Sequence, residues 1–166
     1  MRRMFILIVI VAVALAVAVP AVGSHLRFEA ELTGAEEVPP VATNTTGRAG
    51  VEFNHTRTRA AFRVQVSDGE AVTQAHFHCA PEGVNGPVVA FLFGFIPGGF
   101  DVDGELAEFT LTDANILADA TPSETCPVDI NTLADLARAM GRGLIYANVH
   151  TVANPGGEVR GQMEQS

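Results

Sequence analysis

Short runs of alternating apolar and polar residues, most of them followed by a glycine- or proline-containing turn, constrain this fold more than any other feature. Residues 26–32, 61–66 and 72–78 follow this pattern, which places the apolar side chains of a half-buried β-strand on one face. Further strands are predicted at 49–53, 88–93, 106–111, 144–150 and 158–163. Seven or eight short strands predict an all-β protein, a β-sandwich or Greek-key barrel.

Two of these segments carry more detailed predictions. Residues 88–93 are apolar throughout, which predicts a short strand that is buried on both faces. The tripeptide Ser67-Asp68-Gly69 lies between two alternating runs and is predicted to turn the chain back, so that residues 61–66 and 72–78 form separate strands.

One short α-helix is predicted from Asp129 to Gly141. Its apolar residues recur at the spacing of a single helix face, at positions 133, 136, 137 and 140. Asp129 or Asn131 is expected to cap the beginning of this helix, and Gly141 is expected to end it.

The first 23 residues have the composition of a secretory signal peptide. Two arginines precede an apolar run over residues 4–19, and small residues follow up to Gly23. A membrane anchor is the alternative, because the run is almost long enough to begin spanning a bilayer. We predict cleavage after Gly23, so that one domain, residues 24–166, is secreted to the periplasm or the extracellular space without a stable membrane anchor.

The charge of the chain excludes two classes of partner. The net charge is −9, and removal of Arg2 and Arg3 with the leader makes it −11. A domain this acidic is repelled by nucleic acids and by anionic membrane surfaces. Neither is therefore expected as a partner, whereas an extracellular protein partner is compatible with the charge.

Three histidines occur at strand positions that favour a shared metal site. His76 and His78 flank Phe77, so the two imidazoles lie on the face opposite the expected core residue. His150 ends the run 144–150, and it also lies opposite the apolar row of its strand. Three imidazoles can bind zinc or copper. The alternative is that they are polar strand residues that hydrogen-bond to their neighbours.

Other ionisable residues fit less demanding roles. The adjacent Glu36 and Glu37 resemble an acid–base pair or a calcium ligand set, but a solvated loop is the simpler interpretation of their position before Pro39. His55 lies in a predicted turn and is expected to be solvated. His25 would contribute to a copper site only if cleavage made it the mature N-terminus.

The two cysteines, Cys79 and Cys126, suit an oxidising compartment, where they would close one loop as a disulfide. A loop of this size contributes about 4 kcal/mol in the chain-entropy model. The alternative is a pair of unrelated thiols. A disulfide would also fix the residue that follows His78.

Three motifs resemble the CHRD domain, a family named from chordin and found in exported bacterial proteins. They are LTGAEEVPP at 32–40, AHFHCAP at 75–81 with GVNGPVV at 83–89, and YANVHT at 146–151 followed by NPGGEVRGQ at 154–162. The resemblance covers essentially the whole mature chain. It implies a β-sandwich of immunoglobulin-like appearance, but it does not imply an established biochemical activity.

The pattern is also distantly similar to that of copper/zinc superoxide dismutases, which have a Greek-key barrel. This resemblance implies that His76, His78 and His150 occupy the positions of copper ligands. It also implies that Arg160 stands near the position of an arginine that guides the anion. The chemistry would be redox cycling of copper.

Two departures from that pattern limit the comparison. Cys79 matches a disulfide cysteine, but Cys126 lies earlier than the dismutase pattern places its partner. The cluster of histidine and aspartate that binds zinc is missing between residues 79 and 88. Any site is therefore expected to hold one metal ion, copper or zinc, with its fourth ligand unassigned.

Three functions are compatible with the sequence. The first is an exported metal-binding module that uses the three histidines. The second is a metal-free adhesion or interaction domain, in which the histidines form hydrogen bonds across the sheet. The third is a copper-dependent enzyme that is similar to superoxide dismutase.

Overall fold

The computed structural model describes residues 25–166, so the predicted signal peptide lies outside the described residues. Within these residues there is one α-helix, α1 (Leu133–Met140), and there are short 3-10 turns at Gly34–Glu36, Asp113–Asn115 and Ala118–Ala120. The strands of this part of the chain are β1 (Leu26–Thr33), β2 (Thr46–Phe53), β3 (Ala60–Cys79), β4 (Val88–Phe93), β5 (Phe100–Leu111), β6 (Ile145–Thr151), β7 (Val159–Gln162) and β8 (Glu164–Gln165).

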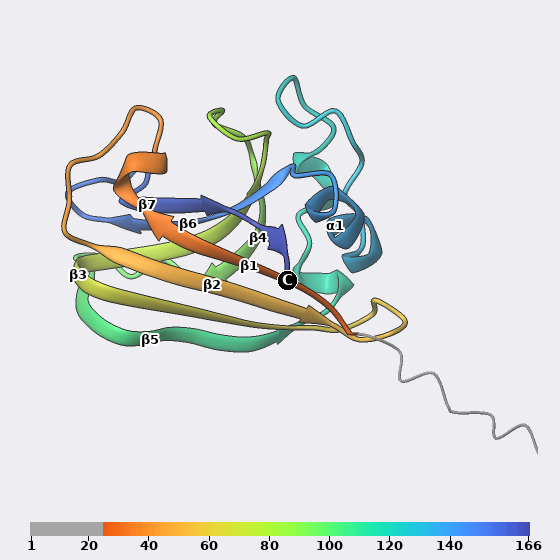
Figure 1. Cartoon of the computed structure of the whole chain (residues 1–166), viewed down its shortest axis with the longest axis horizontal. Helices are drawn as coiled ribbons and strands as arrows, with labels where there is room; N and C mark the ends of the chain where they lie inside the picture. The colour runs from red at the N-terminus through yellow and green to blue at the C-terminus, as the bar shows by residue number, and fades with distance from the viewer. Residues whose placement is uncertain (1–24) are drawn as a thin grey trace, which may run out of the picture.

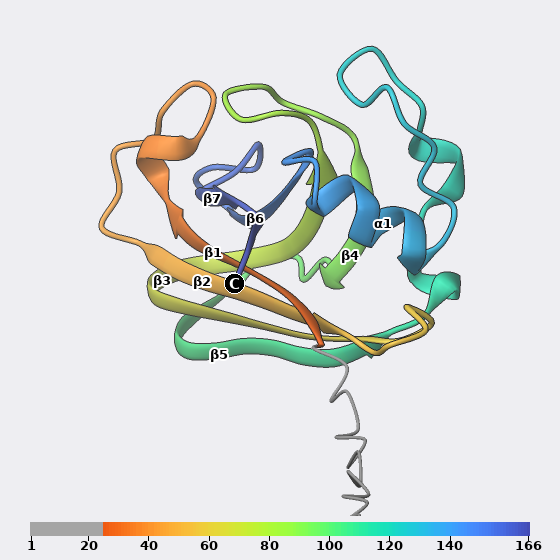
Figure 2. The ribbon, with the colours of Figure 1, turned by 45° about the vertical axis from the view of Figure 1, so that its right-hand side comes forward.

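The sheet closes into a barrel because β3 belongs to both of its layers. Hydrogen bonding follows the order β2-β1-β7-β6-β3-β4, and β2 also pairs with β3, so the path returns to its own start. The first half of β3 pairs with β2 and β5, and its second half pairs with β6 and β4. Figures 1 and 2 show β6 and β7 on one side of the layer that β1, β2, β3 and β5 form. The prediction of an all-β barrel with one short helix is confirmed.

The predicted turn at residues 67–69 is wrong, because β3 runs through these residues without reversing. Asp68 and Ala71 adopt left-handed backbone conformations, with φ of 54° and 47°. The pairing of β3 with β5 shifts its register on each side of Gly69. Such bulges bend and twist a strand but do not end it, which allows β3 to pass from one layer to the other.

The prediction that residues 88–93 are buried on both faces holds only in part. These residues form β4, and Val89 and Ala90 are fully buried, but Phe91 is 47% exposed. β4 pairs along one side with β3 and is joined on the other, among the described residues, only by a single bridge from Ala90 to Ile116. It is therefore a peripheral strand, with one face partly open to solvent.

The helix is shorter than predicted and begins at a different cap. Thr132, not Asp129 or Asn131, is the N-cap residue of α1, and Gly141 is the C-cap as expected. The Thr132 hydroxyl accepts a hydrogen bond from the Asp135 N–H (3.2 Å), and the Asp135 carboxylate accepts one from the Thr132 N–H (3.0 Å). This reciprocal capping box outweighs the two upstream candidates. No helix in residues 25–166 has the length and apolar character needed to cross a membrane.

Replacement of Thr132 by alanine is expected to lower the free energy of unfolding by about 1 kcal/mol, because the first turn of α1 loses its hydroxyl acceptor. Chemical denaturation of the variant measures this loss. Thr132→Ser is the matched control, since it keeps the hydroxyl and should retain most of the stability. A serine variant as unstable as the alanine variant would contradict this role of the cap.

Candidate metal centre

The second half of β3 and the neighbouring β6 have an apolar face toward the barrel core and a buried polar face on the other side. Phe77 is fully buried in the core, as predicted. His76, His78 and His150 lie on the opposite face, but they are not open to solvent: their exposed fractions are 3%, 8% and 4%. The loop at 81–87 contacts His78 on this face, and the loop at 152–158 contacts His150.

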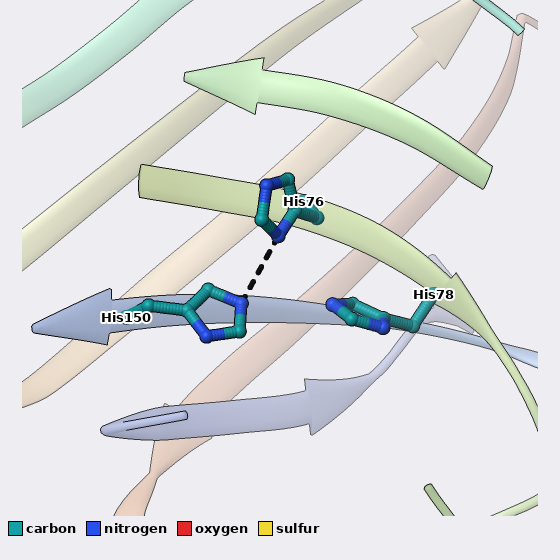
Figure 3. A group of neighbouring side chains, drawn as sticks. All are labelled: His76, His78 and His150. Atoms are coloured by element: carbon teal, nitrogen blue, oxygen red, sulfur yellow. Dashed lines mark hydrogen bonds between the residues drawn. The ribbon is translucent and has the colours of Figure 1, made fainter. Parts of the chain in front are cut away.

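The three imidazoles converge, although they come from strands that are far apart in the sequence (Figure 3). β3 and β6 pair in a register that places His76 opposite Asn148 and His78 opposite Tyr146. His76 Nδ1 lies 3.0 Å from His150 Nε2. One ring nitrogen from each of the three histidines lies within 4.8 Å of the others. The structure thus places residues 76, 78 and 150 on the same side of the barrel.

Backbone carbonyls fix the tautomers of two of these rings. His78 Nδ1–H donates to the carbonyl oxygen of Gly86 (3.0 Å), and His150 Nδ1–H donates to that of Pro155 (3.1 Å). Because a carbonyl oxygen can only accept, each Nδ1 carries the proton and each Nε2 keeps its lone pair. Metal-binding histidines are commonly oriented in this way by an acceptor on the second ring nitrogen.

Burial keeps the cluster uncharged at neutral pH. Desolvation, with the two neighbouring histidines, lowers the pKa of His76 to about 3. Desolvation likewise lowers the pKa of His78 to about 4, although the hydrogen bond to Gly86 opposes the shift. Burial also lowers the pKa of His150. All three rings are therefore neutral imidazoles, the form that binds a metal ion.

Within residues 25–166, the buried side-chain nitrogen and oxygen atoms that have no hydrogen-bond partner gather in this layer and in the loop beside it. They are Glu37 Oε1, His76 Nε2, His78 Nε2 and Asn148 Oδ1. Each such atom costs about 1–3 kcal/mol relative to its hydration in the unfolded chain. Their concentration at one place indicates a position where a ligand would supply the missing interactions.

Tyr146 and Arg160 cover one side of the cluster. The Tyr146 ring stacks on His78, with centroids 4.9 Å apart and an interplanar angle of 12°. The Arg160 guanidinium lies over the Tyr146 ring, 4.7 Å from the centre of the ring. Arg160 is 3% exposed and donates to the Glu36 carbonyl and to Asn85 Oδ1. It therefore ties two loops to the sheet, and anion guidance by Arg160 stays a prediction.

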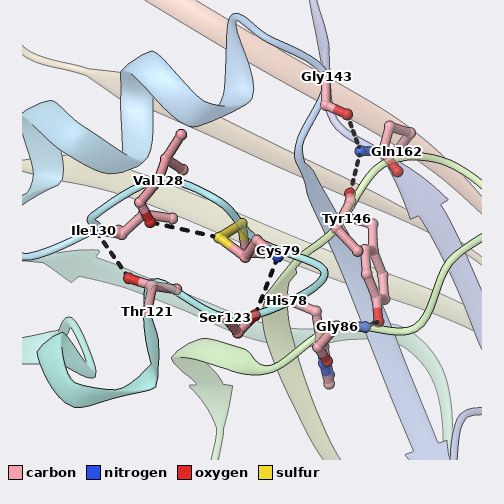
Figure 4. Close-up of a disulfide and its surroundings, with 12 residues drawn as sticks. His78, Cys79, Gly86, Thr121, Ser123, Val128, Ile130, Gly143, Tyr146 and Gln162 are labelled. Carbon is pink, nitrogen blue, oxygen red and sulfur yellow. Dashed lines mark hydrogen bonds between the residues drawn. A yellow bond between two sulfur atoms is a disulfide. The ribbon is translucent and has the colours of Figure 1, made fainter.

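The Cys79–Cys126 disulfide predicted from the sequence is present, with Cα atoms 5.4 Å apart. It joins the end of β3 to the loop that precedes α1 (Figure 4). Cys79 directly follows His78, and both cysteines are fully buried. The crosslink therefore anchors the strand end that carries one of the three imidazoles.

The cluster has polar neighbours that sequence reasoning missed. Tyr146 and Asn148 precede His150 by four and two residues, so the same strand alternation that placed His150 on this face could have found them. Glu37 was expected in a solvated loop, but it is 4% exposed. Only the approach of the β1–β2 loop to the sheet buries it, and no local pattern signals that contact.

Burial has a strong effect on Glu37. Desolvation, aided by the nearby Glu158, raises the pKa of its carboxyl to about 7, against the opposing effects of Arg160 and of a hydrogen bond from Asn148.

The other histidines in the described part of the chain lie outside the cluster. His25 pairs with Glu52 at 2.9 Å on the surface, and His55 is exposed in a turn, as predicted.

Comparison with known proteins agrees with this description of the chain. The family model of the CHRD domain matches residues 28–163. The matched range contains the three clustered histidines, both cysteines and Arg160. No curated protein and no solved structure matches the chain.

Proposed function

Since the chain belongs to the CHRD domain family, we propose that it is an exported metal-binding module, which holds one copper or zinc ion through His76, His78 and His150. The observation that carries the proposal is the convergence of these three buried, neutral imidazoles. They come from two strands, and carbonyl acceptors hold two of the rings in the tautomer that has a lone pair on Nε2.

The distances suit a first-row transition-metal ion. Metal–nitrogen bonds of about 2.0–2.1 Å in tetrahedral geometry separate two ligand nitrogens by about 3.3 Å. Because His150 Nδ1–H donates to Pro155, its Nε2 accepts the hydrogen bond from His76 Nδ1–H at 3.0 Å, so an ion that binds between them would displace this proton from Nδ1. His78 would be the third ligand, because one of its ring nitrogens lies within 4.8 Å of the ligand nitrogens of the other two histidines. Three protein ligands leave a fourth coordination position open.

The ligand type narrows the choice of metal. The group consists of histidines alone, without a carboxylate or a thiolate among the described residues. Imidazole suits copper and zinc, and divalent copper stands above zinc in the general order of affinity. Bound copper would supply one-electron redox chemistry, and bound zinc would act as a Lewis acid. The chain itself orients the rings through the Gly86 and Pro155 carbonyls and the stacked Tyr146, and it buries them away from bulk solvent.

Metal titration of the protein, purified through its export route without added metal, tests the proposal. We expect one ion of copper or zinc per chain by elemental analysis and by competition with a chelator of known affinity. His78→Ala is expected to weaken binding by about 100-fold or more, because it removes a direct ligand. His55→Ala, in an exposed turn, is the control and should leave binding unchanged. Stoichiometric binding that survives in His78→Ala would contradict the site.

A second candidate function is a metal-free extracellular interaction domain. Exposed aromatic side chains favour it: Phe91, Phe95 and Phe109 are 47%, 63% and 58% exposed. Exposed apolar side chains contribute to a surface that contacts another protein when they form one contiguous patch. Absence of metal binding in the titration above would favour this function, with the histidines acting as hydrogen-bonding strand residues.

An enzyme similar to superoxide dismutase is a narrower form of the metal proposal. Copper-loaded protein would then accelerate the decay of superoxide, and His78→Ala would abolish the acceleration. Activity that persists in His78→Ala would exclude this cluster as its source.

A further inference from the structure

Asn148 occupies the middle of the polar face that carries the three histidines. In the sheet it lies directly opposite His76 of β3 on one side and Arg160 of β7 on the other. Along β6 it stands two residues from His150 and two from Tyr146. Side chains of directly opposed residues begin about 4.5–5.5 Å apart at Cβ, and alternate residues of one strand share a face. Asn148 is thus surrounded by the cluster.

The Asn148 amide is oriented by its contact with Glu37. The Asn148 amide nitrogen and the Glu37 carboxyl oxygens lie around one point beside Gly157. The two groups meet beneath Gly157, where an added Cβ would lie 2.7 Å from Asn148 Nδ2 and 2.5 and 2.6 Å from the Glu37 oxygens. Gly157, with φ of 145°, is therefore a position where a side chain would displace this pair. Because Nδ2 faces Glu37, Oδ1 lies at the other end of the amide.

The oxygen at that end has no partner. Asn148 is 2% exposed, and its Oδ1 accepts no hydrogen bond. A buried amide oxygen of this kind needs a donor, and the rings do not supply one: Nε2 of His78 and of His150 carries a lone pair, and His76 Nδ1–H already donates to His150 Nε2. Water bound to a metal ion is a strong donor, because the ion polarises its O–H bonds. It would satisfy both the open coordination position and the orphaned oxygen.

We propose that Asn148, oriented by Glu37, is the positioning residue for the fourth ligand of the ion, a water molecule or hydroxide that donates a hydrogen bond to Asn148 Oδ1. The inference rests on the proposed function, because it requires an ion at His76, His78 and His150. Glu37, the neighbour of Asn148, lines a groove of about 540 Å³ together with Asn85 and residues 38–42 and 153–157.

Copper(II) loaded into the purified protein is the probe, and its electron paramagnetic resonance in H2O and D2O is the readout. The wild-type protein is expected to show coupling to exchangeable deuterons of a directly bound water. Asn148→Leu removes the acceptor, so this coupling should change or vanish, and copper affinity should fall by about 10–100-fold, as for other groups that orient a metal ligand. A purely structural asparagine would leave the deuteron coupling intact.

Asn148→Asp provides an independent test, and it covers the case in which the leucine variant fails to fold. The variant places a carboxylate oxygen beside the open coordination position, so the affinity for copper(II) should rise by about tenfold through the added negative charge. Gln162→Leu is the matched control. Gln162 is an amide on β7 that bonds to the carbonyls of Ala80 and Gly143, and its loss should leave the copper spectrum unchanged.

The outcomes separate the two proposals. Wild-type protein that binds no copper would overturn the proposed function and this inference together. Wild-type protein that binds copper at the three histidines without an exchangeable deuteron coupling would overturn this inference alone. The same holds if neither the leucine nor the aspartate variant alters the affinity or the deuteron coupling.

Discussion

Replacement of both Cys79 and Cys126 by alanine is expected to lower the free energy of unfolding by about 4 kcal/mol. The two cysteines are 47 residues apart in sequence, and a crosslink over this span removes conformational entropy from the unfolded chain. Both sulfur atoms belong to fully buried residues of the core, so their loss also removes packing. Equilibrium denaturation of the metal-free protein measures the difference.

Reduction provides the matched comparison for this prediction. A reductant should destabilise the wild-type protein by a similar amount and should leave the double alanine variant unchanged. A loss below about 1 kcal/mol in both experiments would show that the crosslink contributes little to stability. Because Cys79 follows His78 directly, the double variant should also bind metal more weakly, which the chelator competition described above would measure.

Acidification of the metal-free protein from pH 6.5 to 4.5 is expected to lower the free energy of unfolding by about 3 kcal/mol. The pKa values of His76 and His78 lie near 3 and 4 in the folded protein and near 6.5 in the unfolded chain. Between these values only the unfolded chain binds the protons, so each ring costs about 1.4 kcal/mol of stability per pH unit as the pH falls.

Glu37 acts with the opposite sign over the same range. Its pKa is raised to about 7 in the folded protein from 4.5, so the folded state binds this proton first and gains stability as the pH falls from 7 to 4.5. The stability gained by protonation of this one carboxyl therefore offsets the stability lost through about one of the two histidines. Below pH 4.5 this compensation ends and the loss should steepen. Glu158, whose pKa is lowered by hydrogen bonds, adds to the loss there.

The variant Glu37→Gln separates these contributions. It removes the compensating carboxyl, so the slope of stability against pH between 6.5 and 4.5 should roughly double, from about 1.4 to about 2.7 kcal/mol per pH unit. Urea denaturation at a series of pH values measures both slopes. An unchanged slope in the variant would contradict the assignment of a raised pKa to Glu37, and a flat profile in the wild-type protein would contradict the neutral, buried histidines.

Alternation along single strands predicted the faces of the candidate site correctly. Phe77 lies in the core while His76 and His78 lie opposite, because successive side chains of any β-strand point to opposite faces. The same local rule placed His150. The rule failed at residues 67–69, where a turn and a bulged strand have the same sequence signature. There the pairing partners of β3, and not the tripeptide itself, decide that the strand continues.

The sequence by itself determined the all-β class, the short helix, and which side of each strand carries an imidazole, because these depend on neighbours within a few residues. Only the tertiary structure decided that the imidazoles meet, since His76 and His150 are 74 positions apart in the sequence and β3 and β6 pair in a register that no local pattern sets. It also decided their burial and the approach of Glu37 to Asn148. Loops that are distant in sequence bury the imidazoles and bring Glu37 to Asn148 by packing onto the sheet. These loop contacts exist only once the barrel has closed.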